Sequence, residues 1–181
     1  RRGGRAEARR NAFEVLREGL TILSPAEITR LDLFMRRRQR TLVHRLVQMG
    51  EDTPEDLLAL TTLRDPSLPP GSHNLMVTIL AIALGRLVGM RRRDLVRLGI
   101  AALNHNLGES LLPPDVLDAP RALTDEERGV IERHPLLGMR YILRHHGFEI
   151  PMVERALASA EHHLHWDGAG GYAVQLPEHL H

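Results

Sequence analysis

The sequence predicts an all-α protein, a helical bundle with a further helical region at its N-terminus. Apolar side chains recur at helical spacing along most of the 181 residues, and no stretch alternates apolar and polar side chains convincingly. Aromatic residues, which favour strands, make up only 3% of the chain. Helix-start signals, in which a capping residue precedes a proline or a glutamate, occur at several places.

Three helices are expected in the first part of the chain. An amphipathic pattern predicts the first over residues 6–20. The run Ser-Pro-Ala-Glu combines a cap, a proline suited to the first helical position and a capping-box glutamate. It predicts a second helix over residues 24–49, with Gly50 as its stop. Thr53-Pro54 begins a short third helix.

A loop rich in proline, residues 64–71, separates two regions. We assign residues 1–62 to an N-terminal helical region and residues 72–181 to a second domain. In that domain helices are expected at residues 72–88, 93–105, from the capping box at Thr124 onward, 135–145 and 151–165, with a proline-rich turn over 111–120.

The charge balance excludes a general polyanion-binding protein. The chain has 24 cationic side chains, all arginine, and a formal net charge of +1. Two local basic runs, residues 36–38 and 91–93, are interpreted as solvated helix faces and helix ends. We therefore expect no nucleic-acid polymer as a partner.

The absence of cysteine excludes disulfides, thiolate zinc sites and cysteine nucleophiles. It is consistent with a reducing compartment, and we expect a cytoplasmic protein. The most apolar stretch, residues 75–84, is about half of the ~20 residues that a membrane span needs, so no membrane insertion is expected. The chain begins with Arg1 rather than Met, which indicates a fragment or a processed sequence.

The histidines carry the functional signal. Five of them recur at predicted helix ends around a common set of loops: His73, His105, His134, His162 and His163. Neutral imidazole is a common metal ligand, and helical bundles build metal sites from side chains on separate helices. Spacing alone leaves open whether these are ligands or ordinary surface and core histidines. The ordinary interpretation is preferred for His44, His145, His146, His179 and His181.

The sequences around these histidines form a longer pattern. It consists of His73-Asn74-Leu75, His105-Asn106-Leu107-Gly108-Glu109, Leu112-Pro113-Pro114-Asp115-Val116-Leu117, Leu123-Thr124-Asp125-Glu126-Glu127, His134-Pro135 with Gly138, and His162-His163 before Trp166-Asp167-Gly168. In this order the chain resembles the HD-GYP family, a branch of the HD phosphohydrolases, from His73 onward.

The resemblance implies an all-helical bundle of the HD type. In active members it implies a di- or trinuclear iron or manganese centre that hydrolyses cyclic di-GMP. The metal ligands it implies are His73, His105, His134, His162 and His163, and the substrate contacts are Asp167, Gly168 and Tyr172. The family's last metal-binding aspartate would fall beyond residue 181, so the domain is expected to be incomplete at its C-terminus.

The departures from the family pattern fall on the catalytic positions. Asn106 replaces the aspartate that bridges two metals, and Glu109 replaces the lysine that meets the substrate phosphate. Leu164 replaces the glutamate after the paired histidines. Gly-Tyr-Pro has become residues 170–173, Gly-Gly-Tyr-Ala. The charges of the family's aspartate and lysine sum to zero, whereas those of Asn106 and Glu109 sum to −1.

These charges suggest a substitute ligand. His105 and Glu109 are four residues apart and would share a face if the helix continued through Gly108. Glu109 could then replace the missing carboxylate for one metal, while a phosphodiester would meet a carboxylate where it expects an ammonium. The alternative is a solvent-facing Glu109 just past the helix end.

Three functions remain open. The first is a degenerate HD-GYP domain with lost or strongly reduced hydrolysis, which binds a cyclic dinucleotide or a signalling protein. The second is an active metal-dependent phosphodiesterase, and the third is a helical scaffold that holds no metal. Residues 28–49 could also form a linker helix, a homodimer seam or a helix packed on the bundle.

Overall fold

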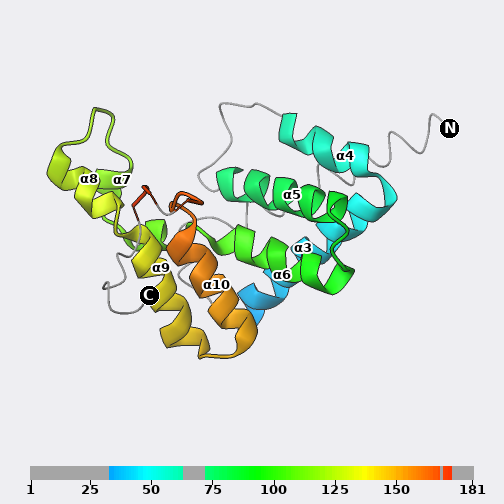
Figure 1. Cartoon of the computed structure of the whole chain (residues 1–181). Coiled ribbons are helices and arrows are strands. Elements are labelled where there is room, and N and C mark those ends of the chain that lie inside the picture. The colour runs from blue at the N-terminus through cyan, green and yellow to red at the C-terminus, as the bar shows by residue number, and fades with distance from the viewer. Residues whose placement is uncertain (1–32, 63–71, 168, 173–181) are drawn as a thin grey trace. The chain divides into compact units, whose positions relative to one another are not determined.

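The computed structural model describes residues 33–62, 72–167 and 169–172, which form helices and connecting turns (Figure 1). The elements are α3 (Leu33–Asp52), α4 (Pro54–Ala59), η1 (Leu60–Thr62), α5 (Ser72–Leu87), α6 (Arg92–Asn104), η2 (Leu107–Leu111), α7 (Pro114–Leu117), α8 (Asp125–Ile131), α9 (His134–His146) and α10 (Ile150–Glu161). No strand occurs in these ranges, so the all-α prediction is confirmed.

The chain divides into two compact units, Arg1–Leu103 and Asn104–His181. The helix predicted over residues 6–20, and the start of the one predicted from residue 24, lie outside the described residues. The domain boundary expected between residues 62 and 72 stays a prediction.

One apolar core holds the first unit together. It contains fully buried side chains from each of its long helices, among them Leu46 of α3, Ile79 of α5 and Leu103 of α6. Leu57 of the short α4 joins the same cluster. Burying a leucine or isoleucine side chain contributes about 1.5–3 kcal/mol, so this core is the main stabilising contribution to the unit.

Gly50 does not stop α3, and that prediction is wrong. The helix continues to Asp52, and Gly50 is buried inside its last turn. A Cβ at this position would lie 3.1 Å from Leu57 and 3.3 Å from Arg86. The glycine is therefore used for close packing of α4 and α5 rather than for a C-terminal cap.

Helix α5 buries one face and exposes another. Leu75, Ile79 and Ile82 have no exposed surface, whereas Leu84 and Leu87 are 62% and 84% exposed. The helix has 16 residues, shorter than a bilayer needs. None of the helices in the described ranges is both long enough and apolar enough to cross a membrane.

The second unit is built on the packing of α9 against α10, which lie side by side in Figure 1. Their contact buries Ile142 on one helix and two alanines, Ala156 and Ala160, on the other. Such small side chains let the two backbones approach closely. The turn η2 packs against α9 as well, and this places it next to the start of that helix.

Helix α10 ends earlier than predicted. It stops at Glu161 instead of residue 165, and His162 is its C-cap residue. The two paired histidines therefore lie in the turn after the helix. Helix α6 likewise ends at Asn104, one residue before the predicted end.

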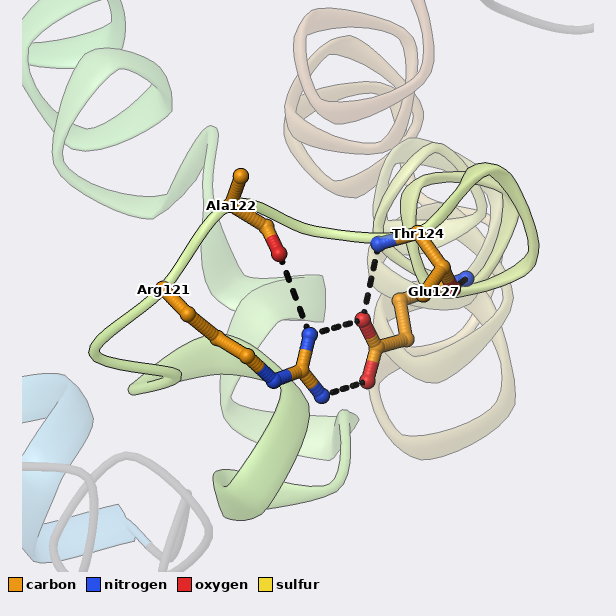
Figure 2. Close-up of polar contacts among 4 residues, drawn as sticks. All are labelled: Arg121, Ala122, Thr124 and Glu127. Carbon is orange, nitrogen blue, oxygen red and sulfur yellow. Dashed lines mark hydrogen bonds and ion pairs between the residues drawn. The ribbon is translucent and has the colours of Figure 1, made fainter.

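The capping box that predicts α8 is present and is extended by an ion pair (Figure 2). The Glu127 amide donates to the Thr124 hydroxyl, and the Thr124 amide donates to the Glu127 carboxylate at 2.9 Å. Two nitrogens of the Arg121 guanidinium donate to the same carboxylate at 2.8 and 2.6 Å. The hydrogen bonds from Arg121 and from the Thr124 amide lower the pKa of Glu127 to about 2.

We predict that Glu127 makes the stability of the second unit depend on pH. A carboxyl whose folded pKa is about 2, below its ordinary 4.5, stabilises the fold above pH 4.5. That contribution is lost as the pH falls from 4.5 toward 2. Thermal unfolding should show Glu127→Gln melting below the wild type at neutral pH, with the difference shrinking under acid. Glu126→Gln, on the preceding residue, is the matched control, and an equal loss in both variants would contradict the prediction.

Candidate functional site

Four of the five predicted histidine ligands lie in the second unit. His105 follows the end of α6, His134 is the first residue of α9, and His162 and His163 follow the end of α10. Three separate turns therefore bring these rings to one place. His73 lies on α5 in the first unit, where it is exposed.

The four rings form a contact cluster. The His162 ring centroid is 4.9 Å from that of His105, 5.1 Å from that of His134 and 4.2 Å from that of His163. His134 and His163 are 5.1 Å apart. One ring nitrogen from each of His134, His162 and His163 lies within 4.8 Å of the others, so these three could hold one metal ion.

Backbone carbonyls fix the orientation of two of these rings. Nδ1 of His134 donates to the carbonyl oxygen of Ile131 at 2.8 Å, and Nδ1 of His162 donates to that of Ser159 at 2.8 Å. A carbonyl oxygen can only accept, so the proton must sit on Nδ1 in each ring. In metal sites, histidine ligands usually hold their second nitrogen in this way.

Both rings are neutral at pH 7. Burial lowers the pKa of His162 to about 4, although its hydrogen bond to Ser159 acts in the opposite direction. Burial also lowers the pKa of His134, against the hydrogen bond to Ile131. Each ring thus presents an unprotonated Nε2, the form that binds a metal.

These two Nε2 atoms face each other at 3.1 Å. With both protons on Nδ1, two lone pairs point at one another without a donor between them. A cation placed against both nitrogens relieves that repulsion. Two ligand nitrogens about 2.1 Å from one ion and at right angles are about 3 Å apart, so the pair fits a metal ion.

Asn106 adds an unpaired oxygen close to the cluster. Its side chain is 9% exposed, and its buried Oδ1 has no hydrogen-bond partner within the described part of the chain. An unpaired buried acceptor costs about 1–3 kcal/mol. An amide oxygen is a competent ligand for a hard cation, so Asn106 also fits a metal, without contributing charge.

Close approach of two backbones places Asn106 beside α9. A Cβ on Gly108 would lie 1.8 Å from the carbonyl oxygen of His134, and one on Gly138 would lie 3.1 Å from the Gly108 nitrogen and 2.2 Å from Ser159 Oγ of α10. No side chain fits in either place. The two glycines therefore set the distance between η2 and the first turns of α9.

The expectation that His105 and Glu109 share a face of one continuing helix is wrong. Helix α6 ends at Asn104, and Glu109 lies in the 3-10 turn η2. Glu109 is nevertheless half-buried, and this burial raises its pKa. Burial raises the pKa of Tyr172, and the nearby charge of Glu109 raises it further. Glu109 is not one of the three residues whose ligand atoms lie within 4.8 Å of one another.

Of the three predicted substrate contacts, Tyr172 is the one that contacts the histidine cluster in the described part of the chain. The Tyr172 hydroxyl and His163 Nε2 form a hydrogen bond of 2.9 Å, and their rings stack at 4.2 Å, so Tyr172 joins the cluster. The Asp167 side chain is exposed and accepts from the Ala169 amide at 3.0 Å, which is a turn contact. Gly168 lies outside the described residues.

The loop from His163 to Tyr172 is closed by backbone contacts. Gly171 has a φ of +90°, and a Cβ there would lie 1.9 Å from the His163 carbonyl oxygen. The His165 amide donates to the Gly170 carbonyl at 3.0 Å. Trp166, between these contacts, is 98% exposed.

Sequence reasoning missed the residues that orient the rings. Ser159 is fully buried, its carbonyl holds His162, and its hydroxyl donates to the Pro135 carbonyl at 3.4 Å. Ile131 holds His134 through its carbonyl alone. Each lies three residues before its histidine, but a backbone acceptor has no sequence signature.

A family model described as HD domain matches residues 32–176. The chain is 32% identical over 117 residues to the cyclic di-GMP phosphodiesterase PA4108 of Pseudomonas aeruginosa, which covers 65% of this chain and 28% of that protein. It is 36% identical over 75 residues to a cyclic di-GMP phosphodiesterase of Vibrio cholerae, covering 40% of this chain and 15% of that protein. It is 31% identical over 68 residues to the cyclic di-GMP phosphodiesterase PdeB of Borreliella burgdorferi. That match covers 38% of this chain and 18% of that protein. The chain thus spans less than a third of the length of these relatives, and no solved structure matches it.

We predict that Gly108→Ala disrupts the cluster by steric conflict. The added methyl would lie 1.8 Å from the His134 carbonyl, and such overpacking costs roughly 1–3 kcal/mol. Gly129→Ala is the matched control, since nothing lies within 4 Å of a Cβ there and a helical Gly→Ala change gains about 0.5–1 kcal/mol. Urea unfolding measures both variants. Equal stability of Gly108→Ala and the wild type would contradict the close approach.

Proposed function

The chain belongs to the HD domain family, and on that basis we propose that it is a degenerate HD-GYP-type signalling domain. It binds a divalent metal through its histidine cluster and recognises a cyclic dinucleotide or a signalling protein, with hydrolysis lost or strongly reduced. The facing Nε2 atoms of His134 and His162, 3.1 Å apart, are the observation that carries this proposal.

The metal would be held by nitrogen and oxygen donors. The first three ligands would be the clustered histidines His134, His162 and His163. The ring of His105, which contacts that of His162, and the Asn106 side-chain oxygen would add two further ligands. His73 is the remaining histidine that the family pattern gives as a ligand. Imidazole together with amide and carboxylate oxygens suits iron or manganese. When bound, such an ion supplies charge stabilisation to a phosphate group.

Asn106 is the reason for expecting reduced hydrolysis. Holding two cations close together requires negative charge between them, and an amide supplies none. Loss of a group that merely supports a ligand typically costs ~10–100-fold in metal affinity or activity, and loss of a bridging carboxylate should matter at least as much. We expect one metal rather than a bridged pair.

Glu109 has two consequences in this proposal. Its oxygens lie outside the group formed by His134, His162 and His163, so the half-buried carboxylate could act as a substitute ligand only if a bound metal drew its side chain toward them. Its negative charge would also repel the phosphates of a cyclic dinucleotide, where the family has a lysine. Both effects favour holding a metal over turning over a phosphodiester. A half-buried Glu109 without a ligand role is the alternative.

An active metal-dependent phosphodiesterase is the second candidate. The chain keeps each histidine of the motif, and four of them are gathered in one cluster. The relatives named above are cyclic di-GMP phosphodiesterases. A cytoplasmic location and a homodimer remain part of the proposal, although the apolar face of α3 is packed in the core of the first unit.

We predict that metal binding depends on the cluster and on Glu109. Elemental analysis after loading with manganese should show bound metal in the wild type and at least ~10–100-fold weaker affinity in His162→Gln, which removes a ligand. Glu109→Gln should lower the affinity by a smaller factor. His145→Gln is the matched control, because His145 lies at the exposed end of α9. Equal metal content in Glu109→Gln and the wild type would exclude the carboxylate as a ligand.

The loss of hydrolysis is tested by restoring the motif. We predict no detectable turnover of cyclic di-GMP by the iron- or manganese-loaded protein under anaerobic conditions, and measurable turnover by Asn106→Asp combined with Glu109→Lys. The two changes supply a bridging carboxylate and a phosphate-facing cation. Turnover by the wild type that His105→Ala abolishes would instead establish the active phosphodiesterase.

A further inference from the structure

The first unit contains a basic groove remote in sequence from the histidine cluster. It has a volume of about 600 Å³ and is lined by Arg37, Arg40, Thr41, His44, Arg45, Gln48 and Arg92. Six of these residues come from one face of α3, and Arg92 is the first residue of α6. We refer to these seven residues as the arginine groove.

The groove joins the two basic runs that the sequence suggests are separate solvated faces. Arg37 belongs to the first run and Arg92 to the second, 55 positions further along the chain. An ion pair between Arg92 and Glu51 holds the start of α6 against the end of α3. The meeting of the two runs is therefore fixed by the fold of the unit.

The lining is one-sided in charge. Four of its seven residues are arginines, and none carries a carboxylate. Among the described residues, Arg37 and Arg40 have no ion-pair partner. Burial lowers the pKa of His44, and the charges of Arg40 and Arg92 lower it further. Positive charge from both α3 and α6 therefore acts on the His44 ring.

Arg92 already pairs with Glu51, whereas Arg37 and Arg40 have no ion-pair partner among the described residues, so an anion between them would relieve their mutual repulsion. Guanidinium groups bind phosphate oxygens through two parallel hydrogen bonds, and the Thr41 hydroxyl adds a neutral donor. The Gln48 amide nitrogen already donates to Asp52 at 2.8 Å. The volume lies in the range of small-ligand sites, roughly 300–1,000 Å³. Among the described residues, no phenylalanine, tyrosine or tryptophan lines the groove, so the imidazole of His44 is the one aromatic ring of the lining on which a base could stack.

We propose that the arginine groove is a binding site for a small phosphorylated ligand that carries at least two negative charges close together. The overall net charge of +1 gives no general attraction to long polyanions, so a compact ligand is favoured over a nucleic acid. The groove shares no residue with the metal cluster, and its residues belong to the other unit. A ligand bound in the arginine groove would give the protein a second binding site besides the proposed metal site.

Isothermal titration of the whole chain with inorganic pyrophosphate tests the proposal. The protein is first treated with EDTA and then dialysed into metal-free, chelator-free buffer, so that no metal in the histidine cluster contributes and no chelator competes for the groove. We expect saturable binding to one site and affinity roughly tenfold or more weaker in Arg40→Gln, which removes a charged hydrogen-bond donor. Arg128→Gln, an exposed arginine of α8, is the matched control for the change in net charge.

A parallel titration with cyclic di-GMP identifies the source of the phosphates. Binding that is weakened by Arg40→Gln but not by Arg128→Gln supports the groove, whichever of the two ligands shows it. Absence of saturable binding for both ligands would overturn the proposal, as would equal weakening by the two variants. Tighter, Arg40-dependent binding of a single-stranded oligonucleotide would also overturn it, in favour of a nucleic-acid site. Thermal unfolding of Arg40→Gln verifies that the variant is folded.

Discussion

The organisation of the second unit depends on two hydrogen bonds from imidazole to backbone. By accepting from Nδ1, the carbonyls of Ile131 and Ser159 determine which nitrogen of His134 and His162 carries the proton. The remaining nitrogens are then forced to meet as lone pairs. An arrangement of this kind is unfavourable by itself and becomes favourable around a cation. The turns before α9 and after α10 are shaped to keep it in place.

In the proposed function, Asn106 and Glu109 together change the charge of the site. They stand where the HD-GYP pattern has an aspartate and a lysine, so the proposed site carries one net negative charge in place of a zwitterionic pair. Glu109 lies in a 3-10 turn whose close packing against α9 depends on Gly108. Under the proposed function, this turn would keep the histidine cluster in place while Asn106 and Glu109 weaken action on a phosphodiester. Binding of a metal and reduced catalysis would then be compatible.

Local signals predicted the helices well, and tertiary packing explains the errors. The capping box at Thr124 starts α8 as expected, because its hydrogen bonds lie within four residues. Gly50 was read as a helix stop, although its role is contact with Leu57, which no local pattern reveals. Motif order identified the clustered histidines, but not the carbonyls that orient them. The arginine groove joins residues 55 positions apart, so charge patterning alone could not show it.

The exposed ring of Trp166 has a practical consequence. It is the single tryptophan of the chain, it is 98% exposed, and it lies within the loop that joins His163 to Tyr172. Indole fluorescence moves to shorter wavelength when water around the ring is replaced by protein or ligand. The intrinsic emission of this protein therefore reports on one loop beside the histidine cluster, without any added label.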